Sequence, residues 1–300
     1  MSRSEKEFSR ITEIKMELTK WQEKIKEIKL ALNQSYSSVN IRWKYLFVCG
    51  CPRSGTTAIL NLLNYHPLIA LGVERYKHYA NKTLIHKLNP DLFQPSVFFD
   101  VREEQTNLNP QHKGWENQWK PFYEELKEKF PKNTTIIGDK FPHYYEFYEE
   151  INAQFTSAGV KFIFMLRDII DVALSYDARA KNQKDIGWGR NRNYKFAVSD
   201  WNQSLINTWN YLENRKQENL FICEYEKLFS GDDRYLNLLL NFLDINSERE
   251  FFAYYKSMTQ NWKKYKQREK VIDQEELTYI EQNSNYVLRD KILQKYAPQA

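Results

Sequence analysis

The sequence has few cysteines, glycines and prolines for its length of 300 residues. Its three cysteines, Cys49, Cys51 and Cys223, are an odd number, which favours free thiols in a reducing compartment over a disulfide framework. Nine glycines and nine prolines are too few for long disordered tracts. These shortages predict a folded globular protein.

Long apolar runs and a strong excess of charge are also missing. Runs such as FIFML are far shorter than the roughly 20 residues that a membrane span needs. The polar start MSRSEKEFSR lacks the apolar region of a secretory signal. A formal net charge of +5 is mild and does not resemble the basic face of a nucleic-acid binder. We therefore expect a cytoplasmic protein that binds neither nucleic acid nor membrane.

Residues 1–40 are predicted to form a separate N-terminal amphipathic helix that ends in a polar linker. Apolar side chains recur there at the a and d positions of a heptad repeat. Three heptads are marginal alone, so we expect this stripe to be buried either against the protein's own domain or in a homodimer. The stripe comprises Ile11, Ile14, Leu18, Trp21, Ile25, Ile28 and Leu32.

Residues 41–300 are predicted to form one α/β domain. Short apolar runs alternate with helical segments, which predicts a P-loop-like, mainly parallel sheet with helices on both faces. The clearest strand, VKFIFML, is apolar on both faces. The expected strands are 45–50, 69–73, 134–140, 160–168 and one beginning at 220; the expected helices are 56–66, 119–130, 143–155, 169–180, 201–215 and 273–296.

The segment VCGCPRSGTTAIL is similar to a phosphate-binding loop without its lysine. Gly50 and Gly55 keep the spacing of G-x-x-x-x-G-K-[ST], but Thr56 occupies the lysine position. A strand, a glycine loop and a helix N-terminus surround an anion with backbone N–H groups. Arg53 and Thr57 add donors. Since phosphoryl transfer relies on the lysine and on Mg²⁺, this loop favours a phosphate that is held while an attached group leaves.

A second anion site is predicted after the clearest strand. Arg167 ends that strand, where open α/β sheets bind ligands, and Ser175 lies two turns into the next helix. Only a ligand with two separated phosphates needs both sites. The alternative is that Arg167 pairs with Asp168 or Asp171 and that Ser175 is a surface residue.

Four segments in order resemble the sulfotransferases that use 3′-phosphoadenosine 5′-phosphosulfate (PAPS), in the style of bacterial enzymes and tyrosylprotein sulfotransferases. GCPRSGTTAILNLLNYHP resembles the 5′-phosphosulfate loop and GDKFPHYY the G-D-K-x-P segment. FIFMLRDIIDVALSY resembles the 3′-phosphate segment, and YEKLFSGDDRYLNLLLNFLDI the element that follows it. The resemblance covers roughly residues 45–262.

The resemblance implies where the donor would bind. The loop would hold the 5′-phosphosulfate, and Arg167 with Ser175 would hold the 3′-phosphate. Tyr225 would line the adenine pocket, and Trp262 with one or two nearby cations would close over the 3′-phosphate. The loop residues are Arg53, Ser54, Gly55, Thr56 and Thr57; the nearby cations are Lys263, Lys264, Lys266 and Arg268.

The resemblance also implies the catalytic groups. Glu74 would accept the proton of the acceptor, and for this role partial burial should raise its pKa toward neutrality. Lys140 and Arg53 would stabilise charge on the leaving phosphate. We expect Asp139, which precedes Lys140, to orient its neighbours rather than to react. His78 and His143 are rival bases.

These features predict transfer of a sulfuryl group from PAPS to a hydroxyl or amine of a small metabolite or natural product, leaving 3′,5′-bisphosphoadenosine (PAP). Residues 77–130 and 181–200 would form the acceptor pocket and its lid. No metal is expected, because the five histidines are scattered and Cys49-Gly-Cys51 has no partner pair. The alternatives are a P-loop kinase and a non-catalytic nucleotide-binding scaffold.

Overall fold

The structure, a computed structural model, describes residue 24 and residues 43–100, 120–130, 134–156, 159–185, 187–214, 219–266 and 272–298. All elements discussed below belong to the compact unit Trp43–Ala300. The heptad stripe and linker predicted for residues 1–40 lie outside the described residues, apart from Lys24, so their helix, their role in a homodimer and the domain boundary stay predictions.

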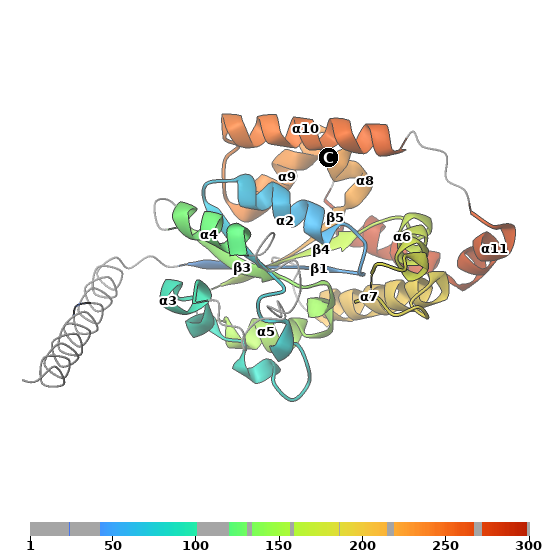
Figure 1. The fold of residues 1–300 in the computed structure, drawn as a ribbon, viewed down its shortest axis with the longest axis horizontal. Coiled ribbons are helices and arrows are strands. Elements are labelled where there is room, and N and C mark those ends of the chain that lie inside the picture. Colours follow the sequence, from blue (N-terminus) through green and yellow to red (C-terminus); the bar gives the residue numbers. More distant parts are fainter. Residues whose placement is uncertain are drawn as a thin grey trace, which may run out of the picture. The chain divides into compact units, whose positions relative to one another are not determined.

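The described strands form a five-stranded parallel sheet in the order β2-β3-β1-β4-β5 (Figure 1), which confirms the predicted α/β class. β1 lies at the centre and pairs with β3 on one side and β4 on the other. Because every strand runs the same way, every carboxyl end lies at one edge of the sheet. The strands are β1 (Lys44–Gly50), β2 (Ile69–Val73), β3 (Ile136–Lys140), β4 (Val160–Leu166) and β5 (Leu220–Glu224).

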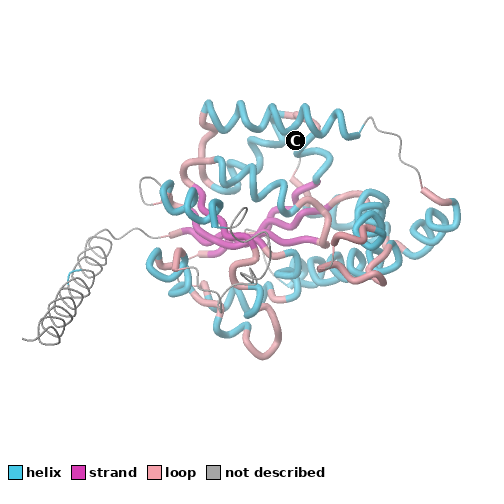
Figure 2. The backbone as a smooth tube through the Cα atoms, in the orientation of Figure 1, coloured by secondary structure: helices cyan, strands magenta, loops and turns pink. Residues whose placement is uncertain are grey.

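Helices cover both faces of the sheet (Figures 1 and 2). Alternate residues of β1 enter different cores: Leu46 and Val48 pack with α2, α9 and α10, whereas Phe47 and Cys49 pack with α5 and α7. The helices are α2 (Thr56–Tyr65), α3 (Pro95–Phe98), α4 (Lys120–Lys129), α5 (Tyr148–Gln154), α6 (Ile169–Lys181), α7 (Tyr194–Asn214), α8 (Tyr225–Phe229), α9 (Asp233–Leu243), α10 (Arg249–Lys266), α11 (Gln274–Asn283) and α12 (Tyr286–Tyr296).

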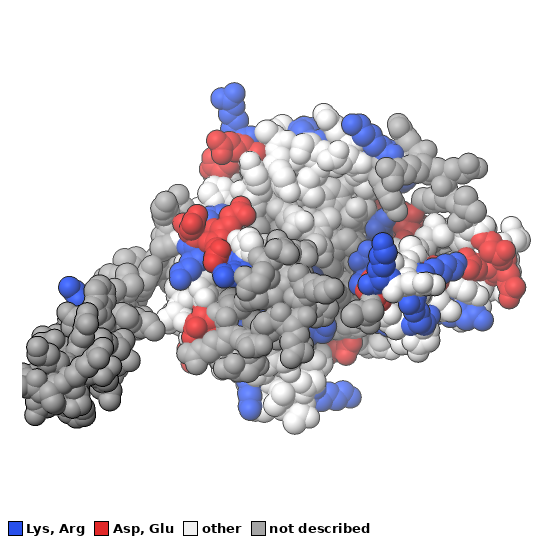
Figure 3. Space-filling view, in the orientation of Figure 1, with Lys and Arg blue, Asp and Glu red and all other residues white. Residues whose placement is uncertain are grey.

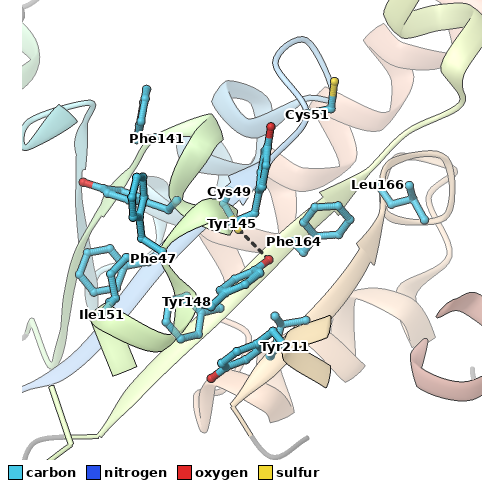
Figure 4. Packing of buried hydrophobic residues seen from close by; sticks show 14 of the residues in the cluster. Phe47, Cys49, Cys51, Phe141, Tyr145, Tyr148, Ile151, Phe164, Leu166 and Tyr211 are labelled. Atoms are coloured by element: carbon cyan, nitrogen blue, oxygen red, sulfur yellow. Dashed lines mark hydrogen bonds between the residues drawn. The ribbon is translucent and has the colours of Figure 1, made fainter. Parts of the chain in front are cut away.

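The core beneath α5 and α7 is rich in aromatic side chains (Figure 4). The ring of Phe47 meets those of Tyr144 and Phe155 edge-on, with both centroids 5.2 Å away. Cys49 Sγ and Tyr148 Oη lie 3.2 Å apart and share a hydrogen bond, which satisfies a buried hydroxyl. Much of the high aromatic content therefore fills the core.

Two predicted helices are interrupted in the structure. Phe147 breaks the segment 143–155 into the 3-10 helix η6 (Pro142–Glu146) and α5. Asn285 breaks the C-terminal segment into α11 and α12, because its side chain accepts a hydrogen bond from Leu288 N at 3.0 Å and caps the second helix. The helix expected from the sequence runs through both segments, so the pattern alone did not predict this break.

We expect Gly138→Ala to destabilise the fold strongly, because β1 and β3 approach each other closely there. A Cβ atom at Gly138 would lie 1.7 Å from the carbonyl oxygen of Leu46, its register partner. Overpacking typically costs about 1–3 kcal/mol, and a clash with a backbone atom places this substitution at the upper end. The free energy of unfolding in urea measures the loss. Gly187→Ala is the control, because among the described residues other than its chain neighbours its Cβ would meet one atom within 4 Å, Asp185 Oδ1 at 3.9 Å. Equal losses in the two variants would show that the close approach of the strands is not the cause.

Candidate active site at the carboxyl edge of the sheet

The predicted site residues lie at the carboxyl ends of the parallel strands. Glu74 follows β2, Lys140 ends β3, the glycine loop follows β1, Arg167 follows β4 and Tyr225 follows β5. The strand order β2-β3-β1-β4-β5 therefore places Glu74 and Lys140 on one side of the loop, and Arg167 and Tyr225 on the other. Open α/β sheets bind ligands at this edge.

The loop between β1 and α2 requires both of its glycines. Gly50 has φ 143° and Gly55 has φ 99°, conformations that side chains rarely adopt. A Cβ at Gly55 would lie 2.3 Å from the ring of Tyr225, and one at Gly50 would lie 2.4 Å from Met165 O. The two glycines thus bring the loop backbone against β4, at Met165, and against the first residue of α8, Tyr225.

The loop and the start of α2 present hydrogen-bond donors to an anion. Gly55 is the N-cap of α2, and no side chain caps the helix N-terminus. Ser54 is fully buried, and its Oγ has no hydrogen-bond partner. Thr56, at the position of the missing lysine, is buried, whereas Thr57 is exposed. Uncapped N–H groups and a buried hydroxyl without a partner are what an anion site provides.

Arg53 links the two predicted anion sites. It adopts a left-handed conformation, with φ 71°, and its Nε donates a hydrogen bond to Ser175 Oγ at 2.9 Å. Arg167 Nη1 donates to the carbonyl oxygen of Arg53 at 3.3 Å. The side chain of Arg53 was expected at the 5′-phosphosulfate, but in the structure it points toward the predicted 3′-phosphate side.

Arg167 is held by several contacts and retains one unused donor. Its side chain is 10% exposed, and its Nη2 lies 3.6 Å from Asp171 Oδ2, so the pairing considered as an alternative does form. Its guanidinium lies 4.5 Å from the centre of the Tyr225 ring. Its buried Nε has no partner. The same residue can therefore pair with Asp171, stack on Tyr225 and still donate to an anion.

Arg179 belongs to this group but was not singled out from the sequence. It lies one helical turn after Ser175 on α6, and its Nε lies 2.5 Å from Asp185 Oδ2. Burial lowers the pKa of Arg53, and the positive charges of Arg179 and Arg167 lower it further. The sequence does indicate this position, because Arg179 lies four residues after Ser175 and therefore on the same face of the helix. Three arginines thus converge beside the loop, and Figure 3 shows Lys and Arg side chains gathered over α6.

Glu74 and Lys140 form an ion pair on the other side of the loop. Lys140 Nζ lies 3.2 Å from Glu74 Oε1, and Lys77 Nζ lies 3.5 Å from Oε2. Lys140 is almost completely buried, whereas the Glu74 side chain is 30% exposed. Burial alone would raise the pKa of Glu74, but the attraction of Lys140 and Lys77 outweighs it and lowers the pKa. The expected upward shift was therefore wrong.

The rival bases have separate surroundings. His143 Nδ1 lies 2.9 Å from Glu146 Oε1 and 3.2 Å from Tyr145 Oη. The ring centres of His78 and Tyr79 lie 4.0 Å apart, with the rings tilted by 46°. Burial and then the charge of Arg75 lower the pKa of His78. The ion pair with the buried Lys140 is formed by Glu74.

The predicted acceptor region is only partly described. Phe93 and Phe98 are fully buried and fill the core, so aromatic content there does not by itself indicate a pocket. Trp188, in the segment 181–200, packs between cations: the guanidinium groups of Arg179 and Arg192 lie 4.4 and 4.3 Å from its ring centre.

The predicted C-terminal group lies mainly on α10. Trp262 packs against the core beneath α10, and Lys266 Nζ lies 5.0 Å from its ring centre. Arg268 lies outside the described residues.

The described residues contain no group of three or more His, Cys, Asp or Glu side chains placed to hold a metal ion. Cys49, Cys51 and Cys223 are buried and free. Within the described part of the chain, no helix is both long and apolar enough to cross a membrane.

A parallel sheet with a glycine loop and converging guanidinium groups at its carboxyl edge defines a P-loop-like α/β protein. More specifically, the chain belongs to the sulfotransferase family: a family model described as "Sulfotransferase family" matches residues 46–249, more than half of the chain. It is therefore a sulfotransferase-family enzyme, and enzymes of this family depend on PAPS.

Several solved structures are similar to this chain. The sulfotransferase domain from the curacin biosynthetic pathway is 20% identical over 80% of this chain and 97% of that one, with a TM-score of 0.45. Sulfotransferase STF9 from Mycobacterium avium is 13% identical over 91% and 81%, with a TM-score of 0.44. Mouse sulfotransferase SULT7A1, complexed with PAP, is 13% identical over 85% and 84%, with a TM-score of 0.44. No curated protein was found to match the sequence.

We expect Lys77→Met to raise the pKa of Glu74. Burial raises this pKa, and without Lys77 only the positive charge of Lys140 remains of the two lysines that lower it. Carbon-13 NMR titration of the Glu74 carboxyl group measures the change. Lys82→Met removes an exposed lysine and serves as the control. An unchanged or lowered pKa of Glu74 in Lys77→Met would contradict the ion-pair explanation.

Proposed function

We propose that this enzyme transfers a sulfuryl group from PAPS to a hydroxyl or amine of a small acceptor and releases PAP. The strand order is the observation that carries the proposal. It provides, along one edge, a carboxylate–lysine pair after β2 and β3, an anion loop after β1, and arginine and tyrosine side chains after β4 and β5. This sequence of groups suits an acceptor, a sulfuryl group, a 5′-phosphate and a 3′-phosphoadenosine in that order.

The residues fit a donor with two phosphate groups. Ser54 Oγ and the uncapped N-terminus of α2 provide donors for the 5′-phosphate. Arg167, with its unpartnered buried Nε, and Ser175 provide donors for the 3′-phosphate. Arg53 lies between them and can serve either phosphate. Tyr225, stacked on Arg167, offers its ring to adenine.

The donor supplies an activated sulfuryl group, and the protein moves a proton and stabilises charge. Glu74 is ionised at neutral pH, since its pKa is lowered, and can accept the proton of the attacking hydroxyl or amine. Lys140, 3.2 Å from Glu74, faces the same space and can stabilise charge on the leaving phosphate. When Lys140 shares its charge with a phosphate, it holds Glu74 less strongly, and Glu74 becomes a stronger base.

The loop chemistry favours this reaction over phosphoryl transfer. A buried threonine, Thr56, stands where a kinase-type loop has its lysine. A 5′-phosphate that keeps its place while the sulfuryl group departs needs the cradle but not that lysine. We propose that the reaction needs no metal ion.

The remaining assignments rest on the sequence. We propose that the acceptor is a small metabolite or natural product. We propose that the enzyme acts in the cytoplasm, where buried free cysteines such as Cys49 and Cys223 are stable. We also propose that the N-terminal helix mediates a homodimer.

We expect PAP to bind in the presence of EDTA and Arg167→Ala to bind it about 30- to 100-fold more weakly. The variant loses charge-assisted hydrogen bonds, each worth about 1.5–3 kcal/mol. Isothermal titration calorimetry measures both affinities. Arg234→Ala, which removes an exposed arginine paired with Asp232, is the control. If PAP does not bind the wild-type protein without metal, the donor assignment fails.

We expect Glu74→Gln to lower kcat by about 10²–10⁴-fold, the usual contribution of a general base. PAP affinity should not fall, because Glu74 lies on the acceptor side of the loop. Turnover with PAPS, and PAP binding by calorimetry, separate the two effects. Glu150→Gln, at an exposed carboxylate of α5, is the matched control. Full activity of Glu74→Gln would show that another group acts as the base.

A further inference from the structure

Asp139 is a fully buried carboxylate next to the proposed catalytic pair. It precedes Lys140 in β3 and is 0% exposed. Its Oδ1 accepts hydrogen bonds from Arg75 N and Lys140 N, both at 3.0 Å. Its Oδ2 accepts from Tyr76 N at 3.0 Å and from Tyr144 Oη at 2.7 Å. Four donors thus converge on one carboxylate, and three of them are backbone N–H groups.

Two of these donors belong to the turn that carries Glu74. Arg75 N and Tyr76 N are consecutive N–H groups just after β2, and each bonds a different oxygen of Asp139. Glu74 itself has φ 52°, a conformation that costs of order 1–3 kcal/mol for a residue other than glycine. Such strain persists only where the surroundings fix it, and here the carboxylate of Asp139 fixes the turn.

The neighbouring strand leaves room for this carboxylate. Gly72 is the register partner of Asp139 in the β2–β3 ladder. A Cβ atom at Gly72 would lie 2.9 Å from Asp139 Oδ1 and 3.0 Å from Arg75 Cβ. The glycine in β2 is thus a second feature that serves the same arrangement.

Asp139 also fixes the other member of the catalytic pair. Its Oδ1 accepts from the N–H of Lys140, and Lys140 in turn accepts a backbone hydrogen bond from Glu74 N at 2.7 Å. The side chains of Lys140 and Glu74 then meet at 3.2 Å. One carboxylate therefore holds the backbone on both sides of the ion pair.

We propose that Asp139 is a positioning residue for catalysis, which holds Glu74 against Lys140 by fixing the turn after β2. This inference rests on the proposed function, since it takes Glu74 as base and Lys140 as the group that stabilises the leaving phosphate. Asp139 does not touch the reacting atoms and acts only through its neighbours.

The carboxylate must be ionised to serve all four donors. Burial raises the pKa of Asp139 to about 6, while hydrogen bonds from Tyr144, Tyr76 and Arg75 and the charge of Lys140 oppose the increase. At pH 8 it accepts four hydrogen bonds. Asn in its place offers one oxygen and an NH₂ group that cannot accept from an N–H.

The experiment compares Asp139→Asn with Tyr144→Phe at pH 8. Asp139→Asn disturbs the turn, and we expect kcat to fall about 10- to 100-fold, since a misplacement of about 1 Å can cost 10²-fold. PAP affinity should stay within twofold. Tyr144→Phe removes a hydrogen bond to the same carboxylate without touching the turn, and kcat should fall less than threefold.

The double variant Glu74→Gln/Asp139→Asn tests whether Asp139 acts through Glu74. If it does, the double variant is as active as Glu74→Gln alone. Independent, multiplicative losses would overturn the proposal, and so would an equal loss of kcat in Tyr144→Phe. If Asp139→Asn does not fold, Gly72→Ala, which crowds Oδ1, replaces it in the same cycle with the same expected outcomes.

Hydrogen exchange separates this inference from the proposed function. In the wild-type protein the amides of Arg75 and Tyr76 should exchange as slowly as those of β3, and in Asp139→Asn or Gly72→Ala they should exchange faster. Fast exchange in the wild type, or no change in the variants, would overturn the positioning role. Failure of PAPS turnover or PAP binding would instead overturn the proposed function and leave the exchange result standing.

Discussion

Parallel pairing of the strands is the constraint on which this site depends. Because all five described strands run in one direction, five loops leave the sheet at the same edge. Chain order and spatial order differ, so Glu74, Lys140, the glycine loop, Arg167 and Tyr225 are arranged as a row that the sequence does not display. A reversed strand would remove one of these groups from the edge.

Strain in the backbone is concentrated at this row. Among the described residues other than glycine, only Arg53, Glu74 and Asp244 have positive φ, and the first two carry proposed functional side chains. Polar contacts hold the first two: Arg167 donates to the carbonyl oxygen of Arg53, and the buried Asp139 accepts from the two residues after Glu74. The cost of these conformations is offset by hydrogen bonds that also position the site.

The sequence predicted what local patterns determine. Apolar runs located the five strands, and two glycines with a fixed spacing located the loop between β1 and α2. The pKa of Glu74 was predicted in the wrong direction, because two lysines, Lys77 nearby and Lys140 far away in sequence, meet its carboxylate only after folding. The position of Arg179 beside Arg53 depends likewise on tertiary packing.

A crystal structure of the enzyme with PAP tests the central claim most directly, since the claim is that strand order sets the direction in which the donor lies. We expect the 5′-phosphate at the loop Cys51–Gly55, the 3′-phosphate within hydrogen-bond distance of Arg167 and Ser175, and the Glu74–Lys140 pair beyond the 5′-phosphate. A 3′-phosphate on the Glu74 side of the loop, or PAP bound away from this edge, would contradict the claim.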